Sequence, residues 1–304
     1  MSLWGKVAYD NRAWKIYATY LYMVRFVALF TKTKIGSIGY NHRNQKSGLV
    51  IVKSVSGHPR MENERDVLKS FQARTPYSRP WVDEIQDPAE PTTIVLRHPD
   101  SDPLEASVQR PLNRKEMKYA LKRILEALSV MHKDGYVHTD IQLGDLGGSY
   151  PRNSEWAKSG ITIGAPIWSS PEVLMETPWN TATDIWSFGT VVISLLYGGD
   201  FNILCPKNVR YGDETYNLEI VKSQFRFFGP FPAKAREIFN DETLMSIVYT
   251  MEMILQDTMT SFRFVTEREV AKEDKDFVLK IMQMDWRDRP TAEELLRGEW
   301  FCTE

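Results

Sequence analysis

Residues 138–147, His-Thr-Asp-Ile-Gln-Leu-Gly-Asp-Leu-Gly, place two acidic residues, Asp140 and Asp145, five positions apart. They follow a segment predicted to be a helix, because Asn113 and Glu116 have capping-box spacing and apolar residues recur behind them at helical intervals. Further along, residues 184–197 are apolar nearly all round, which is typical of a helix buried on every side. The two acids therefore lie in a connection between an amphipathic helix and a buried one.

Upstream, residues 48–55 (GLVIVKSV) are rich in β-branched side chains, which predicts a strand that puts Lys53 on the same face as three aliphatic residues. Residues 61–72 predict a helix whose apolar stripe includes Glu64. An inward carboxylate needs a positive partner, and Lys53 is the nearest candidate in sequence. Two alternatives stay open: the Lys53 amine reaches water along an apolar surface, or Glu64 is solvated at the edge of the stripe.

Composition narrows the class of protein. Among 304 residues, 42% are hydrophobic and 26% are charged, which suits a folded domain and excludes a disordered chain. The net charge of −2 provides no overall field for a polyanion, so nucleic acid is not the expected partner. Two cysteines and five scattered histidines give neither a disulfide framework nor zinc spacing. We expect an intracellular, cytoplasmic location, and no basic cluster indicates a nuclear one.

The N-terminal residues need separate treatment. Residues 16–30 are strongly apolar, but the run is only 15 residues long and contains Arg25, short of the roughly 20 needed to cross a bilayer. Attachment to a membrane is therefore not expected. No small-residue cleavage site follows, so a strand or helix packed on the next domain is favoured over a signal peptide, and a poorly packed extension stays open.

Several short motifs occur in a fixed order. They are VIVK at 50–53, Glu64 in a helix, HTD at 138–140, DLG at 145–147, SPE at 170–172, DIWSFG at 184–189 and DRPT at 288–291. In this order they resemble the signatures of eukaryotic protein kinases, over about residues 48–301. The HTD form is similar to that of fungal-type kinases or pseudokinases. The resemblance implies an α+β, bilobal fold: an extension at 1–30, a small strand-rich lobe at 31–97 with one helix, and a mainly helical lobe at 98–304.

The resemblance also implies roles for four residues. ATP and Mg²⁺ would be the cofactors and a protein Ser or Thr the substrate, because phosphoryl transfer needs cations at the phosphates and an acid at the metal. Lys53 would contact the phosphates while paired with Glu64, and Asp145 would hold Mg²⁺. Asp140 would accept the proton of the substrate hydroxyl.

Three further residues are expected to stabilise the larger lobe rather than to take part in the chemistry. By the same resemblance, Glu172 and Arg289 would form an ion pair that anchors the activation segment. Asp184 would brace the catalytic loop.

The catalytic loop departs from the family pattern. A metal-binding Asn is expected five residues after the catalytic Asp, but that position is Asp145 itself, and only residues 141–144 lie between the two acids. Two short strands and a turn would need on the order of ten residues. Gln142 stands in place of the loop Lys, and Thr139 in place of an Arg that would bind a phosphorylated activation loop.

The glycine-rich phosphate loop is also incomplete, since only Gly36 and Gly39 offer a match, and we predict a turn there. Two hypotheses follow. One is an active serine/threonine kinase, and the other is a pseudokinase that binds a protein partner without turnover. The short junction between Asp140 and Asp145 would also fit a segment lost by splicing or by an incorrect gene model.

Overall fold

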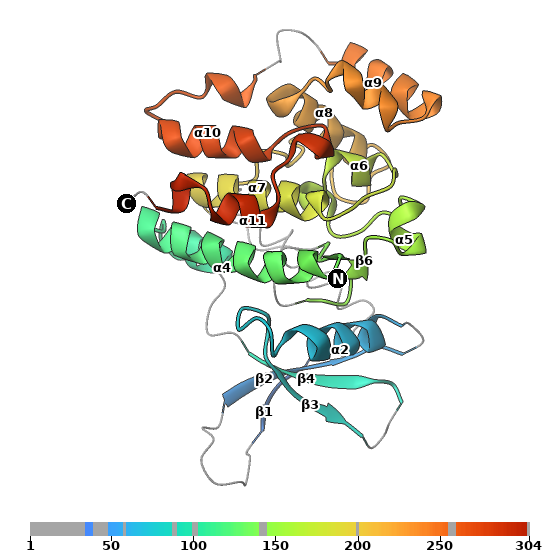
Figure 1. Ribbon diagram of the computed structural model, residues 1–304, viewed down its shortest axis with the longest axis vertical. Coiled ribbons are helices and arrows are strands. Elements are labelled where there is room, and N and C mark those ends of the chain that lie inside the picture. Colours follow the sequence, from blue (N-terminus) through green and yellow to red (C-terminus); the bar gives the residue numbers. More distant parts are fainter. Residues whose placement is uncertain are drawn as a thin grey trace, which may run out of the picture.

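A computed structural model describes residues 34–38, 48–56, 59–86, 90–98, 103–139, 145–198, 201–254 and 260–302. The chain has a strand-rich part followed by a helical part (Figure 1). The strands are β1 (Lys34–Ile38), β2 (Gly48–Ser54), β3 (Trp81–Ile85), β4 (Thr93–Arg97), β5 (Tyr136–Val137) and β6 (Tyr150–Pro151).

The α-helices are α2 (Arg60–Phe71), α3 (Pro103–Gln109), α4 (Arg114–Lys133), α5 (Glu155–Lys158), α6 (Pro171–Leu174), α7 (Ala182–Tyr197), α8 (Tyr216–Phe228), α9 (Asp241–Glu252), α10 (Lys272–Ile281) and α11 (Ala292–Leu296). Short 3-10 helices span Pro166–Trp168, Ala233–Glu237, Phe262–Phe264, Trp286–Asp288 and Glu299–Phe301. Strands early and helices late are the predicted α+β arrangement, and the prediction is confirmed. The predicted extension at residues 1–30 lies outside the described residues.

The N-terminal part is an antiparallel sheet in the order β1-β2-β4-β3, with α2 packed against it. The apolar stripe predicted for this helix is confirmed, because its residues lie in one buried cluster with β4, with Val55 just after β2, and with residues of the helical part. The cluster contains Val55, Met61, Val67, Leu68, Phe71, Ile94, Leu96, Met131 and Leu146. The sheet and α2 are thus joined by a small core that extends into the helical part.

One local prediction was wrong. Gly36 was predicted to lie in a turn, but it belongs to β1 and pairs with Val50 across the β1–β2 ladder. The preference of glycine for turns is outweighed here by the β-branched residues Ile35 and Ile38 on either side of it and by pairing with β2. Gly39, the other glycine of that match, lies outside the described residues.

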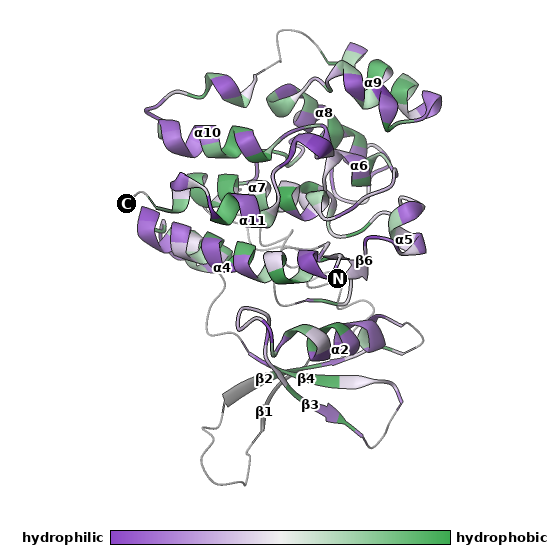
Figure 2. Ribbon diagram, viewed as in Figure 1, coloured by the Kyte–Doolittle hydropathy of each residue, from purple (hydrophilic) through white to green (hydrophobic). Residues whose placement is uncertain are grey.

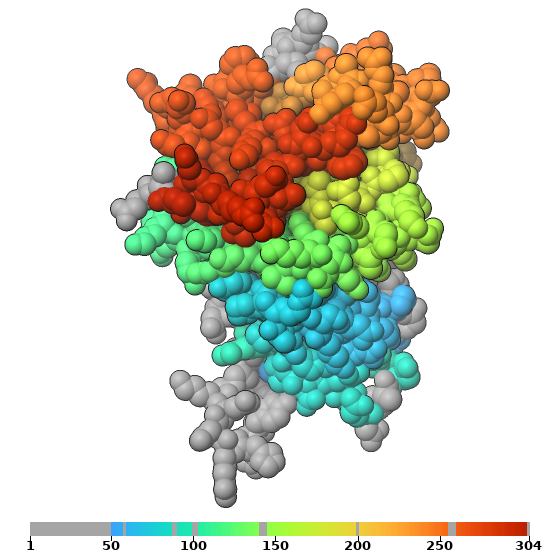
Figure 3. Space-filling view, viewed as in Figure 1, coloured from blue at the N-terminus to red at the C-terminus, as the bar shows by residue number. Residues whose placement is uncertain are grey.

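The helical part is organised around α7. Every position of this helix from Thr183 to Leu195 is buried, as its all-round apolar sequence predicts. The predicted capping boxes at Asn113 of α4 and at Thr291 of α11 both form. Figure 2 shows hydrophilic and hydrophobic residues in turn along α4, and Figure 3 shows the surface of α4 lying directly against that of α2. Helix α4 therefore joins the two parts of the molecule.

Membrane insertion was not expected from the sequence. In the parts of the chain that the structure describes, none of the helices combines the length and the apolarity needed to cross a bilayer.

A buried ion pair between Arg289 and Glu172 connects distant segments of the helical part. The guanidinium of Arg289 donates two hydrogen bonds to the carboxylate of Glu172, at 2.6 and 2.8 Å. The same guanidinium also donates to three backbone carbonyls, including that of Ala182 at the start of α7. Both side chains are almost fully buried. The pair predicted from the SPE and DRPT motifs is therefore present, and it ties α6 to the start of α7.

Removing one partner of this pair should be costly. The variant Arg289→Met leaves Glu172 as an uncompensated buried charge, and we expect the free energy of unfolding to fall by about 3–5 kcal/mol. The double variant Arg289→Met, Glu172→Met should recover part of that loss, because both charges are gone. Chemical denaturation measures both. A loss below about 1 kcal/mol in the single variant would contradict this description of the pair.

Candidate active site

Lys53 and Glu64 meet between the sheet and α2. The ammonium Nζ of Lys53 donates a hydrogen bond of 2.8 Å to Oε1 of Glu64. Both residues are almost completely buried, with 4% of Lys53 and 0% of Glu64 exposed. Strand alternation turns Lys53 toward α2, and helix periodicity puts Glu64 on the stripe that faces the sheet. The pairing expected from the sequence is therefore confirmed, and the two alternatives with solvated groups are wrong.

Asp145 joins this pair from the segment that precedes β6. Its Oδ2 lies 3.6 Å from the Lys53 ammonium, and its Oδ1 accepts a hydrogen bond of 3.0 Å from the backbone N–H of Gly147. Burial opposes ionisation of this carboxyl, but the neighbouring charges of Lys53 and Arg60 outweigh burial and hold its pKa well below the usual range. Asp145 is therefore a buried, ionised carboxylate beside an ammonium group.

Glu64 behaves in the opposite way. Its burial and the nearby charge of Asp145 both disfavour the ionised form, and the attraction of Lys53 only partly offsets them. The pKa of Glu64 is raised to about 7 as a result. Two acids that share one ammonium group thus differ sharply in acidity, and Asp145 is the one that stays charged at neutral pH.

The backbone before Asp140 is held by Asp184 of α7. Its two carboxylate oxygens accept hydrogen bonds from the backbone N–H groups of His138 and Thr139, at 2.8 and 2.9 Å. The ring of His132 on α4 lies 2.8 Å from the same carboxylate. Asp184, with none of its side chain exposed, therefore fixes the backbone of His138 and Thr139, the two residues that precede Asp140.

Thr139 adopts a strained conformation. Its φ is 69°, in the left-handed region that β-branched residues rarely occupy, at a cost of about 1–3 kcal/mol. Two hydrogen bonds hold Thr139 in this conformation. Its backbone N–H donates to Asp184, and its Oγ1 donates to the carbonyl of Gly148 at 2.8 Å. Asp140 follows directly but, like residues 141–144, lies outside the described residues. The structure thus leaves its position as a prediction.

Two residues of the site were not found from the sequence. Arg60 Nη2 lies 3.1 Å from Oδ2 of Asp145, and the Asn63 amide donates to the carbonyls of Gly147 and Ser149 at 3.1 and 3.0 Å. Arg60 stands four residues before Glu64 and three before Asn63, and these spacings put Arg60 on a face shared with each of them. That spacing was the available signal, but the residues that they contact are more than 80 positions away in sequence.

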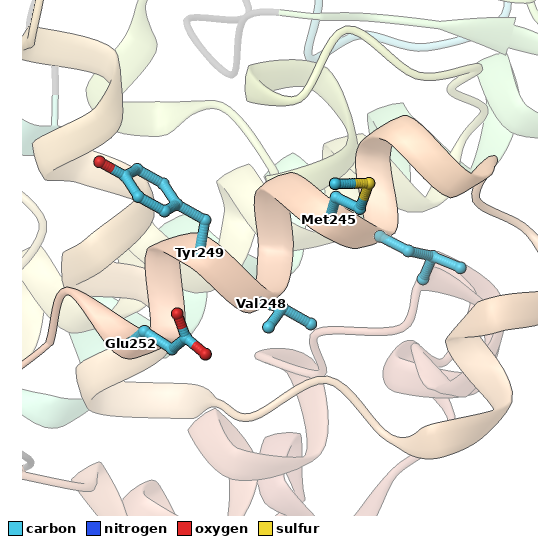
Figure 4. A pocket seen from close by; sticks show the side chains of 5 residues that line it. Met245, Val248, Tyr249 and Glu252 are labelled. Atoms are coloured by element: carbon cyan, nitrogen blue, oxygen red, sulfur yellow. The ribbon is translucent and has the colours of Figure 1, made fainter.

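A surface feature lies on α9, away from the buried cluster of Lys53, Glu64 and Asp145 (Figure 1). A shallow pocket there is lined by Leu244, Met245, Val248, Tyr249 and Glu252. Met245, Val248 and Tyr249 point outward from the helix in Figure 4, and more than half of each residue is exposed. The pocket is open and contains none of the residues singled out by motif.

Comparison with known families identifies the fold. The model of the protein kinase domain matches residues 42–301, which is most of the chain. The chain belongs to the protein kinase family. The bilobal, kinase-like fold inferred from the order of motifs is therefore confirmed. The boundaries of the lobes at 31–97 and 98–304 stay predictions.

Relatives of this kinase domain carry serine/threonine kinase names. The protein named serine/threonine-protein kinase pakE of Dictyostelium discoideum is 26% identical over 193 residues, which cover 55% of this chain and 20% of that protein. Serine/threonine-protein kinase 4 homolog A of the same organism is 25% identical over 191 residues, covering 56% of this chain and 41% of that protein. The kinase domain thus matches between a fifth and two fifths of the length of these relatives.

A solved structure supports the fold independently. A chain in the yeast RNA Pol II CTD kinase CTDK-1 complex superposes on this kinase domain with a TM-score of 0.65. The match covers 88% of this chain and 97% of the other, at 17% sequence identity. At that identity, the similarity concerns the fold alone.

The raised pKa of Glu64 predicts a pH dependence of stability. Between the ordinary value of 4.5 and the folded value of about 7, the folded chain binds a proton that the unfolded chain does not. This contribution therefore makes stability fall as pH rises through that window, by at most about 1.4 kcal/mol per pH unit. Asp145, with its lowered pKa, contributes with the opposite sign and only below its ordinary value of 3.8.

Unfolding of the Glu64→Gln variant should lack this part of the slope. Denaturation at several pH values between 5 and 8 measures the difference from the unsubstituted chain, and Glu252→Gln, an exposed position on α9, is the control. Parallel pH profiles for the Glu64→Gln variant and the unsubstituted chain would show that Glu64 is ionised throughout and would contradict the prediction.

Proposed function

We propose that this kinase domain transfers the terminal phosphoryl group of ATP to a Ser or Thr hydroxyl of a protein substrate. The observation that carries the proposal is the buried contact of Lys53 with Glu64, with Asp145 beside the same ammonium group. In protein kinases, phosphoryl transfer requires the Lys–Glu ion pair and the metal-binding Asp to be in place together. Here all three are brought together from a strand, a helix and a loop.

Each residue has a distinct task in this proposal. Glu64 fixes the position of the Lys53 ammonium group by accepting one of its hydrogen bonds. The remaining N–H groups of Lys53 can then donate to phosphate oxygens. Asp140 takes the proton from the attacking hydroxyl as general base. Asp184 fixes the backbone immediately before that base through the N–H groups of His138 and Thr139.

The donor set suits ATP with Mg²⁺. Mg²⁺ binds through one or two carboxylates and completes its coordination with water and substrate phosphates, and the ionised carboxylate of Asp145 offers one such ligand. No cluster of three or more His, Cys, Asp or Glu side chains that could hold a metal is found among the described residues. Water and the phosphates of the nucleotide would complete the coordination. The metal would neutralise charge on the transferred group.

The class of substrate rests on the relatives, which are serine/threonine kinases by name. A protein substrate, and no nucleic acid, remains the proposal. An intracellular, cytoplasmic location is also proposed, and Cys205 and Cys302 are both free thiols.

The second candidate function is that of a pseudokinase that binds a protein partner without turnover. Two observations favour it. Only residues 141–144 separate Asp140 from Asp145, so no Asn is available five residues after the proposed base. In addition, the Arg60 guanidinium lies on the carboxylate that would hold the metal.

Transfer of labelled phosphate from ATP to a generic protein substrate, or to the chain itself, separates the two functions. With Mg²⁺ present, we expect transfer by the unsubstituted chain and a loss of about 10²–10⁴-fold in the Asp140→Asn variant, because the general base is gone. Asp66→Asn, an exposed position on α2, is the matched control and should retain the activity.

Absence of transfer by the unsubstituted chain, or equal transfer by the Asp140→Asn variant, would overturn the kinase proposal. A rise in melting temperature with a protein partner but not with ATP would then support the pseudokinase function.

A further inference from the structure

Arg60 lies beside Asp145, at the place where a divalent metal would bind if Asp145 is the metal ligand. It begins α2 and stands four residues before Glu64, so both side chains project from the same face of the helix. Glu64 accepts a hydrogen bond from Lys53, and Arg60 pairs with Asp145 at 3.1 Å. One helix face therefore contributes an acid to the ammonium group and a guanidinium to the aspartate.

The oxygens of Asp145 are already engaged. Arg60 and Lys53 lie 3.1 and 3.6 Å from Oδ2, and the Gly147 N–H donates to Oδ1. A Mg²⁺ ion would need an oxygen of this carboxylate at about 2.0–2.1 Å. The guanidinium approaches Oδ2 itself, and a divalent ion placed there would meet two positive groups within a few ångströms. Arg60 and a divalent ion therefore compete for one carboxylate oxygen.

The loop is shaped to accept the arginine. A Cβ atom added at Gly147 would lie 2.7 Å from Cγ and 2.8 Å from Nε of Arg60, so the arginine stem passes directly over the glycine. Asn63, one turn further along α2, fixes the same loop through the carbonyls of Gly147 and Ser149. The contact between Arg60 and Asp145 thus belongs to a packed interface between α2 and the loop, and it is not an isolated surface pair.

Arg60 can leave this place without disrupting the core. Its side chain is 29% exposed, whereas those of Lys53 and Glu64 are 5% and 0% exposed. The two hydrogen bonds of Asn63 do not depend on the guanidinium, so they can hold the loop after Arg60 has moved. In this exchange the long side chain of Arg60 would move toward solvent and the divalent ion would take its place.

We propose that Arg60 is an internal cation of the site, which neutralises Asp145 when no divalent metal is bound and must be displaced for the metal to bind. Arg60 is a positioning residue in this scheme, because it acts on the carboxylate and not on a substrate. The inference rests on the proposed function for one point, namely that Asp145 is the metal ligand. It deepens that function, because metal binding would depend on movement of the Arg60 side chain at the start of α2.

Binding of Mn²⁺ to the purified full chain, without nucleotide, tests the proposal directly. Electron paramagnetic resonance of free Mn²⁺ gives the affinity of the unsubstituted chain and of the Arg60→Gln variant. The variant keeps a polar side chain of similar reach but removes the competing charge. We expect it to bind Mn²⁺ at least about fivefold more tightly, which is the lower end of typical coupling between two ligands.

Two further variants localise the effect. Arg65→Gln removes one positive charge from the same helix, where Arg65 pairs with Asp66 and Glu84, and it should leave Mn²⁺ affinity within about twofold because the charge of Arg65 is directed at those two carboxylates. The double variant Arg60→Gln, Asp145→Asn should lose the gain. Melting curves of all variants check that the chain is folded.

Unchanged or weaker Mn²⁺ binding by the Arg60→Gln variant, an equal gain in the Arg65→Gln variant, or a gain that survives loss of Asp145 would overturn the inference. These outcomes do not depend on turnover. Phosphate transfer that depends on Asp140 can succeed while competition at Asp145 fails, and tighter Mn²⁺ binding can appear in a chain that transfers no phosphate. Failure of the inference and failure of the proposed function are therefore distinguishable.

Discussion

The contact between Lys53 and Glu64 is the interaction on which the geometry of the site depends. Taking an ammonium and a carboxyl group out of water costs several kcal/mol for each ion unless the two meet with good geometry. That requirement constrains the position of α2 against the sheet, because Glu64 must lie within hydrogen-bonding distance of the lysine. The apolar stripe of α2 supplies the favourable burial and the ion pair selects the register. Arg60 and Asn63 then reach the loop at Asp145 as a consequence of that register.

The larger lobe is also held together by buried, hydrogen-bonded charged groups. Buried carboxylates of Asp184 and Glu172 are satisfied by backbone N–H groups and by Arg289, respectively, and each joins segments that are far apart in sequence. A buried charge that is fully hydrogen-bonded specifies one arrangement, because any shift leaves it unpaired. The strained φ of Thr139 is tolerated next to such an anchor. The kinase domain therefore fixes the backbone before Asp140 by hydrogen bonds to a buried carboxylate.

Periodicity in the sequence predicted which faces of the local strands and helices are buried. Contacts between distant residues could be predicted only from the order of the motifs. Alternation along residues 48–55 and the stripe on 61–72 put Lys53 and Glu64 on apolar faces but left solvated alternatives open, and the order of the motifs was needed to predict that the two residues pair. The turn predicted at Gly36 was wrong, because pairing with β2 outweighs the local preference of glycine. The contact of Arg60 with Asp145 could not be predicted, since it depends on how α2 lies over a loop 85 residues away. The role of Asp140 stays a prediction.

The central claim is that the ammonium group of Lys53, held by Glu64, binds the phosphates of a nucleotide. Calorimetric affinities for ATP and for adenosine test it most directly, because adenosine lacks the phosphates. The suitable variant is Lys53→Met, Glu64→Met, which removes both partners together and leaves Asp145 paired with Arg60. We predict that the variant binds ATP at least about tenfold more weakly, as expected for the loss of a charged hydrogen bond, and adenosine with unchanged affinity. Equal loss of both ligands, or no loss of ATP binding, would contradict the claim.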